Sequence, residues 1–461
     1  MLTRQDGRAG RAGRAGRAGQ AGRTGRRGRI KSLLLPLSLG LFLILPGTPD
    51  LPGLPDVVLA AQVPFEQAIA DLASSDAGDR LRAATLLKGS AYPEAAIPLA
   101  KTVADPHDAI QLEAIAAELN IFLATKIVPK KHVALIIEVR NKIVAESAFS
   151  AGPLVLGASP VPAEVLTALR TAARDDNPRV GLEALYAFGT LASSPSGRAR
   201  REMQQSSAPE LAAMVGSSDE ALRAAAIRVI GRVFEARESD AEADMAVGDA
   251  VITALNDKNQ LIKRAAMDTL GAMRYGRAVN ALTQLFQFHA RGEMAEAELD
   301  ALARIGHPAS IPIFVAQLAA KSEKMRAIAI EGLARSGDSS QLPAIEAALK
   351  GERSDAVIFA GVFAAAMLGN GPIERIADTL SRSTSRNMAK QYLTEIARVH
   401  VDRLSRYAQD PNPATRADIA DIVGFSDDEA GLPIVEALAR DQDALVALSA
   451  QRAVARLRPD R

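Results

Sequence analysis

The sequence predicts an all-α fold, a right-handed solenoid of about 11–12 helical hairpins, on three observations. A ten-residue pattern recurs along the chain: an apolar residue, often Arg, two variable residues, a small residue, and a close on an apolar residue and Gly or Ala. Its later copies are spaced by 32, 31, 32, 31, 27 and 31 residues. Within each copy the apolar residues follow helical spacing, not the alternation of a strand. The copies begin at Leu81, Ile110, Val180, Leu222, Ile262, Met294, Met325, Val357, Met388, Thr415 and Val446.

The copy at Val180–Gly189 shows why the pattern predicts a helix. Its apolar and small residues form a broad stripe on one helical face. The fifth position is usually Ala, as in Ala226 and Ala266, and a small residue there lets a neighbouring helix approach closely. Four copies break this rule, and we expect their repeats to pack differently: Thr85, Glu298, Tyr392 and Ile419.

A second amphipathic segment precedes each of these helices, so the repeating unit is a helical hairpin. One hairpin cannot bury both of its apolar stripes, and stability therefore has to come from stacking against neighbouring hairpins. The first helices are expected at Pro64–Leu72, Pro162–Ala173, Ala278–Phe288, Ile311–Leu318, Leu342–Leu349, Ile373–Leu380 and Leu432–Ala439.

The turn inside each hairpin carries charged residues at fixed positions. An Asp lies five residues before the pattern in several copies, among them Asp105 and Asp441, and Pro often follows. Asp can cap the free N–H groups at a helix start, and Pro in the first turn loses no hydrogen bond. Arg or Lys at the second pattern position, as in Arg82, Arg223 and Arg416, can pair with such an Asp. We interpret these charges as helix caps and as an ion-pair ladder between repeats.

The Asp-x-x-Pro turn, the apolar-Arg opening, the small fifth position and the closing Leu-Gly resemble HEAT repeats, in the bacterial form also called HEAT-like or bilin-lyase-type repeats. The resemblance covers roughly residues 64–457. It implies the solenoid fold and little about function, because that superfamily is mostly defined by shape. Some relatives attach or isomerise bilin chromophores, and others are DNA glycosylases.

The first 61 residues differ from the repeats. Residues 1–29 contain an Arg-Ala-Gly tract that cannot bury a core and is predicted to be disordered. Residues 30–61 are predicted to hold a signal peptide, because basic residues precede the apolar run Leu33–Leu45. Small residues favour cleavage after Ala60 or Ala61, which would leave residues 62–461 as an exported solenoid, periplasmic or extracellular, with no stable membrane insertion. The alternative is an anchor formed by uncleaved Leu33–Leu45.

Charge argues against a nucleic-acid partner. The whole chain carries a net charge of +1, from 55 basic and 54 acidic residues. Ten of the basic and three of the acidic residues lie in residues 1–61, so residues 62–461 carry 45 basic and 51 acidic residues, a net charge of −6. Nucleic-acid binding depends on clustered Lys and Arg. The chain also has no Cys, so an exported form would contain no disulfides.

One segment interrupts the period. Residues 130–157 could hold a degenerate extra repeat that begins at Ile143, with Ser147 in the small position and Gly152 at its end. A β-hairpin that turns at Asn141 is the competing interpretation, because β-branched residues flank that turn. We favour helices.

The sequence contains no pattern that indicates catalysis, a cofactor or a metal. No two of its five His share a helical face at ligand spacing, and His107 and His307 fall in inter-helix turns. There is no phosphate-binding Gly-rich loop after a strand and no Gly-x-Ser-x-Gly motif. We therefore expect a non-enzymatic scaffold that binds a partner protein. A bilin-lyase-like enzyme and a nucleic-acid-binding protein are the alternatives.

Two positions of the repeat are candidates for the partner surface. At the seventh position Asp268, Asp300 and Glu331 recur in consecutive copies and predict an acidic ridge, with Tyr186 and Phe363 as apolar contacts towards its ends. Just past the pattern, Arg recurs in several copies. Cations are favourable at helix C-termini, so we interpret this second set as structural. Its members are Arg232, Arg304, Arg335, Arg398 and Arg456.

Overall fold

The computed structural model describes residues 64–124, 143–195, 197–237, 245–382 and 385–458. In these residues the chain forms α-helices and short 3-10 helices, and the predicted all-α solenoid is confirmed. Residues 62–461 make up one compact unit. The predicted leader, residues 1–61, lies outside the described residues.

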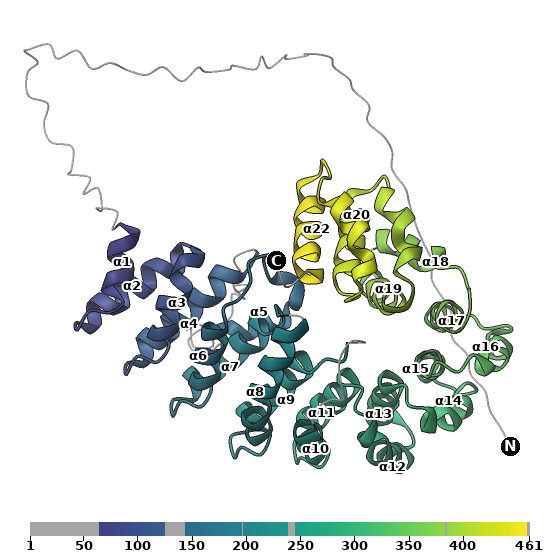
Figure 1. Ribbon diagram of the computed structural model, residues 1–461. Coiled ribbons are helices and arrows are strands. Elements are labelled where there is room, and N and C mark those ends of the chain that lie inside the picture. Colours follow the sequence, from purple (N-terminus) through teal and green to yellow (C-terminus); the bar gives the residue numbers. More distant parts are fainter. Residues whose placement is uncertain (1–63, 125–142, 196, 238–244, 383–384, 459–461) are drawn as a thin grey trace, which may run out of the picture. The chain divides into compact units, whose positions relative to one another are not determined.

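Every copy of the ten-residue pattern lies in the second helix of a hairpin. Figure 1 shows the helices following one another in chain order. The second helices are α2 (Ala77–Gly89), α4 (Asp108–Phe122), α7 (Pro178–Leu191), α9 (Glu220–Val233), α11 (Gln260–Ala272), α13 (Gly292–Ile305), α15 (Glu323–Arg335), α17 (Asp355–Leu368), α19 (Arg386–His400), α20 (Pro413–Gly424) and α22 (Ala444–Leu457).

The first helices are shorter, and several are preceded or replaced by a 3-10 turn. The α-helices among them are α1 (Phe65–Asp71), α3 (Ala96–Thr102), α6 (Ala163–Ala172), α8 (Gly197–Val215), α10 (Met245–Ala254), α12 (Val279–His289), α14 (Ile311–Gln317), α16 (Leu342–Leu349), α18 (Glu374–Ala377) and α21 (Leu432–Leu438). The 3-10 helices η7 (Asp378–Ser381) and η8 (Val401–Gln409) occupy the same place in the later repeats.

Stacking between repeats forms the core, as expected from the small fifth position. The second helices pack on one another, α7 on α9, α9 on α11, α11 on α13 and α13 on α15. Six Ala at the fifth position are fully buried, each with no exposed surface: Ala114, Ala184, Ala226, Ala266, Ala329 and Ala450. Two repeats without a small residue at the fifth position pack differently from these. Thr85 is exposed, and Glu298 is buried and contacts His289 Nδ1 at 2.7 Å.

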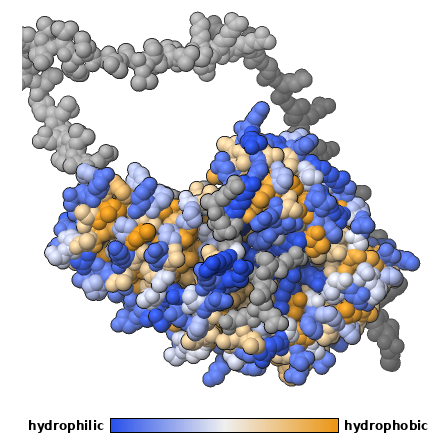
Figure 2. Space-filling view, viewed as in Figure 1, coloured by the Kyte–Doolittle hydropathy of each residue, from blue (hydrophilic) through white to orange (hydrophobic). Residues whose placement is uncertain are grey.

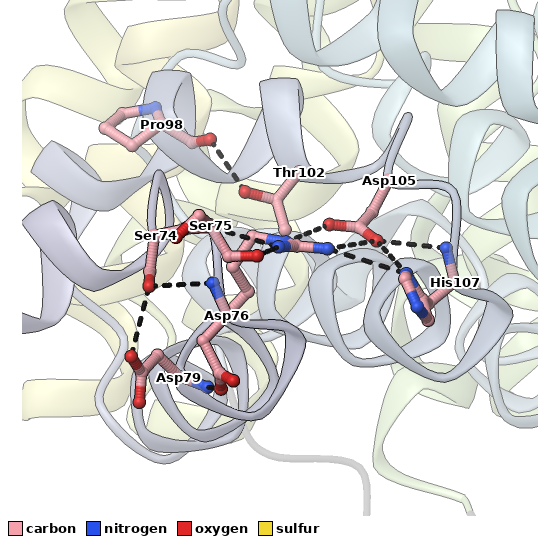
Figure 3. A network of polar contacts seen from close by, with 9 residues as sticks. Ser74, Ser75, Asp76, Asp79, Pro98, Thr102, Asp105 and His107 are labelled. Carbon is pink, nitrogen blue, oxygen red and sulfur yellow. Dashed lines mark hydrogen bonds and ion pairs between the residues drawn. The ribbon is translucent and has the colours of Figure 1, made fainter.

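The hairpin turns contain the predicted ion pairs between repeats, but in the first repeat a different arginine forms the pair. Arg80 Nε donates to Asp105 of the next repeat at 2.6 Å, and its Nη1 donates to the Ser74 carbonyl at 2.9 Å; Figure 3 shows this network around Asp105. Arg82, the residue expected in this role, pairs with Asp79 of its own helix instead. Three later arginines repeat the Arg80 geometry: Arg223 with Asp257, Arg326 with Glu352, and Arg416 with Asp441.

In most repeats the turn Asp does not cap the second helix directly, contrary to our expectation, but hydrogen-bonds to the residue that does. Asp175 accepts the N–H of Asn177, and Asn177 is the residue whose side chain caps α7. At α22, Asp441 likewise accepts the N–H of Asp443, and the Asp443 side chain caps the helix. Only at α2, among the described turns with an Asp at this position, does that Asp (Asp76) cap the helix itself. The turn therefore has two polar layers, one that orders the cap and one that caps the helix.

The irregular segment is helical where it is described. Helix α5 (Val144–Ser150) follows Ile143, as the degenerate repeat predicts, and η3 (Pro153–Val155) follows α5. Glu183 of α7 caps α5 by accepting the N–H groups of Val144 and Ala145 at 2.8 and 2.7 Å. The proposed hairpin turn at Asn141 lies outside the described residues.

Candidate functional site

A hollow of about 800 Å³ lies within the solenoid, lined mainly by the second helices α9, α11, α13, α15, α19 and α20. Eight of its lining side chains are Arg or Lys and four are Asp or Glu, so the lining has an excess of four positive charges. This excess is opposite in sign to the net charge of −6 on residues 62–461. We call this site the arginine-lined hollow.

One contact at the edge of the arginine-lined hollow joins distant parts of the chain. Arg452 of α22 donates to the Leu154 carbonyl in η3 at 3.0 Å, although 298 residues separate the two in sequence. A smaller hollow of about 260 Å³ adjoins the first and shares Leu154, Asp421 and Phe425 with it. The lining thus combines charged side chains with apolar ones.

The predicted acidic ridge is largely neutralised by arginines one helical turn further on. Asp300 pairs with Arg304 at 2.9 Å. Glu331 accepts hydrogen bonds from Arg335 at 2.9 Å and from the Tyr392 hydroxyl at 2.6 Å. Of the three predicted acids, Asp268 is the one that lines the hollow. Two of the three predicted acids are therefore already paired with arginines of this chain.

Desolvation by the surrounding protein raises the pKa of Asp268, although its side chain still reaches solvent. Arg304 opposes this shift in the pKa, and the charge of Asp300 adds to it. Asp268 and Asp300 are thus close enough to repel each other, which the recurrence in sequence did predict. The nearby arginine is the stronger of the two influences.

The two aromatic residues expected at the ends of the ridge are buried. Tyr186 is 5% exposed, and its hydroxyl accepts a hydrogen bond from Arg228 at 2.8 Å. Phe363 has no exposed surface and stacks on Tyr392 with ring centroids 4.3 Å apart. Neither ring offers a free apolar surface to a partner. The seventh position faces packed side chains at these two repeats, because bulky aromatics there fill the gap between adjacent second helices.

The recurrent arginines that follow the pattern line the hollow. Arg232, Arg304, Arg335 and Arg398 all belong to the lining, and Arg456 lines the adjoining hollow. For Arg335 the structural interpretation holds, since it is buried and also pairs with Glu395 at 2.8 Å. For the others that interpretation is incomplete, because their position at the ends of the helices also exposes them to the hollow.

Arg232 and Arg398 differ from Arg335 in their partners. The Arg232 guanidinium lies 4.6 Å from the centre of the Phe149 ring, and its Nη2 donates to the Phe149 carbonyl at 3.2 Å. Its Nη1 is buried and finds no hydrogen-bond partner among the described residues, and the same is true of Arg398 Nε. Burial lowers the pKa of Arg232. In the adjoining hollow, burial and repulsion by Arg237 lower the pKa of Arg456 to about 9.

Glu118 of α4 is a buried acid remote from this lining. It has no exposed surface, and neither carboxylate oxygen has a hydrogen-bond partner among the described residues. Burial raises its pKa to about 9. Within the described part of the chain, no group of three or more His, Asp or Glu side chains is placed to hold a metal ion, and no helix is long and apolar enough to cross a membrane.

A family model described as HEAT repeats matches residues 207–297, a range that includes α9, α10 and α11. The chain therefore contains HEAT repeats. The search of curated proteins gave no match.

Among solved structures, the HEAT-repeat chain is similar to an engineered protein, with 18% identity, a TM-score of 0.39 and coverage of 86% of this chain and 98% of the other. It is also similar to a chain in a structure that concerns the interaction between cadherin and β-catenin, with 13% identity, a TM-score of 0.40 and coverage of 86% of this chain and 94% of the other. A designed armadillo repeat protein for modular peptide recognition matches with 14% identity, a TM-score of 0.33 and coverage of 59% and 99%. At such identities and TM-scores these likenesses say nothing of function.

The HEAT-repeat sequence did carry a signal for the lining residues. Arg recurs at the eleventh position as regularly as acids do at the seventh. Both positions lie near the C-terminal end of the second helix, one turn apart. A cation at this position interacts favourably with the C-terminal end of the helix dipole, whatever surrounds that end. Only the meeting of several helix ends around one space shows that these arginines also line a hollow.

Proposed function

We propose that this HEAT-repeat protein is an exported, non-enzymatic scaffold that binds a partner protein in the arginine-lined hollow. The observation that carries the proposal is the lining itself. One position of the repeat supplies four of its arginines, from α9, α13, α15 and α19, and places them around a single space of about 800 Å³. A repeated position that faces one space can contact an extended ligand at several points, and each further contact adds affinity.

The surface outside the hollow supports the same proposal. In Figure 2 hydrophobic residues are scattered in small groups among hydrophilic ones on the face shown. The large exposed apolar side chains are distributed along the solenoid, from Ile97 of α3 to Leu445 of α22. Contiguous apolar patches mark many protein interfaces. Recognition by charge inside the hollow fits this surface better than docking on an apolar patch.

Export is proposed from the leader. Leu33–Leu45 is apolar and follows a basic segment, and small residues precede Ala61. Removal of residues 1–61 would take away ten basic and three acidic residues and change the net charge from +1 to −6. The arginine-lined hollow would then be the local exception on an acidic chain, and an anionic partner would be steered to it.

Site-specific photo-crosslinking in the native host tests the proposed binding site. A photoreactive residue replaces Leu261, which lines the hollow and is 75% exposed. The matched control replaces Phe288 of α12, which is 82% exposed and outside the lining. We expect a discrete protein adduct from Leu261 and none of the same mass from Phe288. Equal crosslinking from both positions, or a chromophore or nucleic acid at Leu261, would contradict the proposal.

A further inference from the structure

Two arginines of the hollow lack the acidic partners that its other arginines have. Arg228 pairs with Glu146 at 2.6 Å, Arg304 with Asp300, and Arg335 with two glutamates. Arg232 and Arg398 have no carboxylate within ion-pair distance among the described residues. Glu235, which also belongs to the lining, is near enough to Arg232 to raise its pKa and still does not form an ion pair with it.

Each of these two arginines also has a buried nitrogen without an acceptor. Burying a charged donor without a partner is unfavourable, because the group loses its hydration and gains no hydrogen bond. Packing against the Phe149 ring leaves the Arg232 Nη1 donor unsatisfied. A carboxylate in the hollow would neutralise the charge and accept hydrogen bonds from the part of each guanidinium that contributes to the lining.

We propose that the arginine-lined hollow binds an acidic peptide segment, with Arg232 and Arg398 receiving its carboxylates. The inference rests on the proposed function and names the chemistry of the partner. The peptide contributes at least two Asp or Glu side chains, one for each arginine. The remaining arginines of the lining already have acids of this chain beside them, and they contribute the surrounding positive field.

The rest of the lining favours a peptide over a continuous polyanion. Asp268 lies in the same lining and repels a chain that carries a negative charge on every unit, whereas Asp421 is paired with Lys390 and Arg452. Leu154, Leu261 and Phe425 provide apolar surface between the charges. A peptide can place carboxylates at intervals with apolar side chains between them. Polyphosphate and nucleic acid cannot match this alternation, because each of their units bears a phosphate.

Selection from a random peptide library displayed on phage tests the proposal with no need to identify the partner first. The bait is the full chain, and the same selection uses the double variant Arg232→Gln, Arg398→Gln. The control bait is Arg201→Gln, Arg440→Gln, which removes two exposed arginines outside the lining. The basic leader is present in all three baits, so only the enrichment that the control keeps and the double variant loses is assigned to the hollow. We expect the parent and the control to enrich Asp and Glu together with apolar residues, and the double variant to lose this enrichment.

The affinity of the best selected peptide provides the quantitative test. Fluorescence anisotropy should show a loss of about tenfold for each arginine removed, because one charge-assisted hydrogen-bonded pair is lost in each case. Arg232→Lys and Arg398→Lys should recover part of the affinity, since lysine restores the charge and not the fork geometry. Thermal melting of every variant checks that the fold is intact. Affinity that is equal in the parent and the double variant would overturn the proposal.

Two further outcomes separate this inference from the proposed function. If inorganic polyphosphate binds the hollow and no acidic peptide does, the site recognises phosphate polyanions and the peptide proposal is wrong. If Leu261 crosslinks a partner protein through a neutral or basic segment, the scaffold function stands and the acidic-peptide inference fails. If Leu261 and Phe288 crosslink alike, the scaffold proposal fails at this site, and that result is independent of the peptide selection.

Discussion

Replacing Glu118 with Gln should change how the stability of α4 depends on pH. In the parent, burial raises the pKa of Glu118 from 4.5 to about 9, whereas the unfolded chain keeps the lower value. The folded state then holds a proton that the unfolded state releases above pH 4.5. The stabilising contribution is therefore complete at pH values below 4.5 and is lost progressively as the pH rises towards 9.

The size of the effect follows from the width of this window. Each pH unit inside the window removes about 1.4 kcal/mol of stability from the parent. Between about pH 5.5 and about pH 7.5, the parent should lose about 3 kcal/mol that the Gln variant does not lose. At the lower pH the variant is expected to be no more stable than the parent, because its amide donors are buried in the same site. At the higher pH the difference should shift in favour of the variant.

Hydrogen exchange measured by mass spectrometry on peptides from Asp108–Phe122 is the appropriate assay, because a solenoid opens locally. Comparing variant and parent at the same pH cancels the pH dependence of the exchange chemistry. Peptides from α22 in the same samples serve as the internal control, since α22 is far from α4 in sequence. A difference between variant and parent that stays constant across the two pH values would refute the assignment of a protonated Glu118.

Three further predictions concern packing, the acidic ridge and processing. Ala226→Leu and Ala266→Leu overpack fully buried positions, so each should lower stability by about 1–3 kcal/mol, and faster exchange should be confined to adjacent repeats. Unchanged exchange in both would contradict the assigned buried face. Glu331→Gln weakens its contact with buried Arg335 and should lower the urea midpoint, with a loss of about 1–3 kcal/mol; a rise would mean that like-charge repulsion dominates. Sequencing of the native N-terminus should begin at Ala61 or Gln62, and a start at Met1 would disprove cleavage.

The fold was predictable because it depends on contacts that recur every repeat. Ala226 and Ala266 are small because a neighbouring helix passes close by, and each reports that local requirement independently. The ladder was predictable for the same reason, since Arg223 and Asp257 belong to adjacent turns. Both Arg80 and Arg82 lie close enough in sequence to the turn to form the ion pair with Asp105, and the sequence did not distinguish between them.

The site was less predictable because it depends on how many successive repeats are arranged relative to one another. The seventh position was expected to point outward throughout, yet Phe363 is covered because Tyr392 takes the place of a small residue in the next second helix. The arginine positions were recognised, and Arg335 has a structural role, since it pairs with Glu331 and Glu395. Their convergence on one hollow depends on the rotation between successive repeats, and no single repeat reveals that rotation.

The hydrogen bond from Arg452 to the Leu154 carbonyl has an evolutionary consequence. Repeat arrays usually gain and lose units by duplication and deletion, because each unit touches only its neighbours. Between η3 and α22 this freedom is restricted: one more hairpin would move α22 by about the width of a helix, roughly 8–10 Å, and break the contact. The hairpins α1–α2 and α3–α4 lie outside this interval. Relatives of this chain should therefore differ in repeat number mainly before α5, and their length between η3 and α22 should be nearly constant.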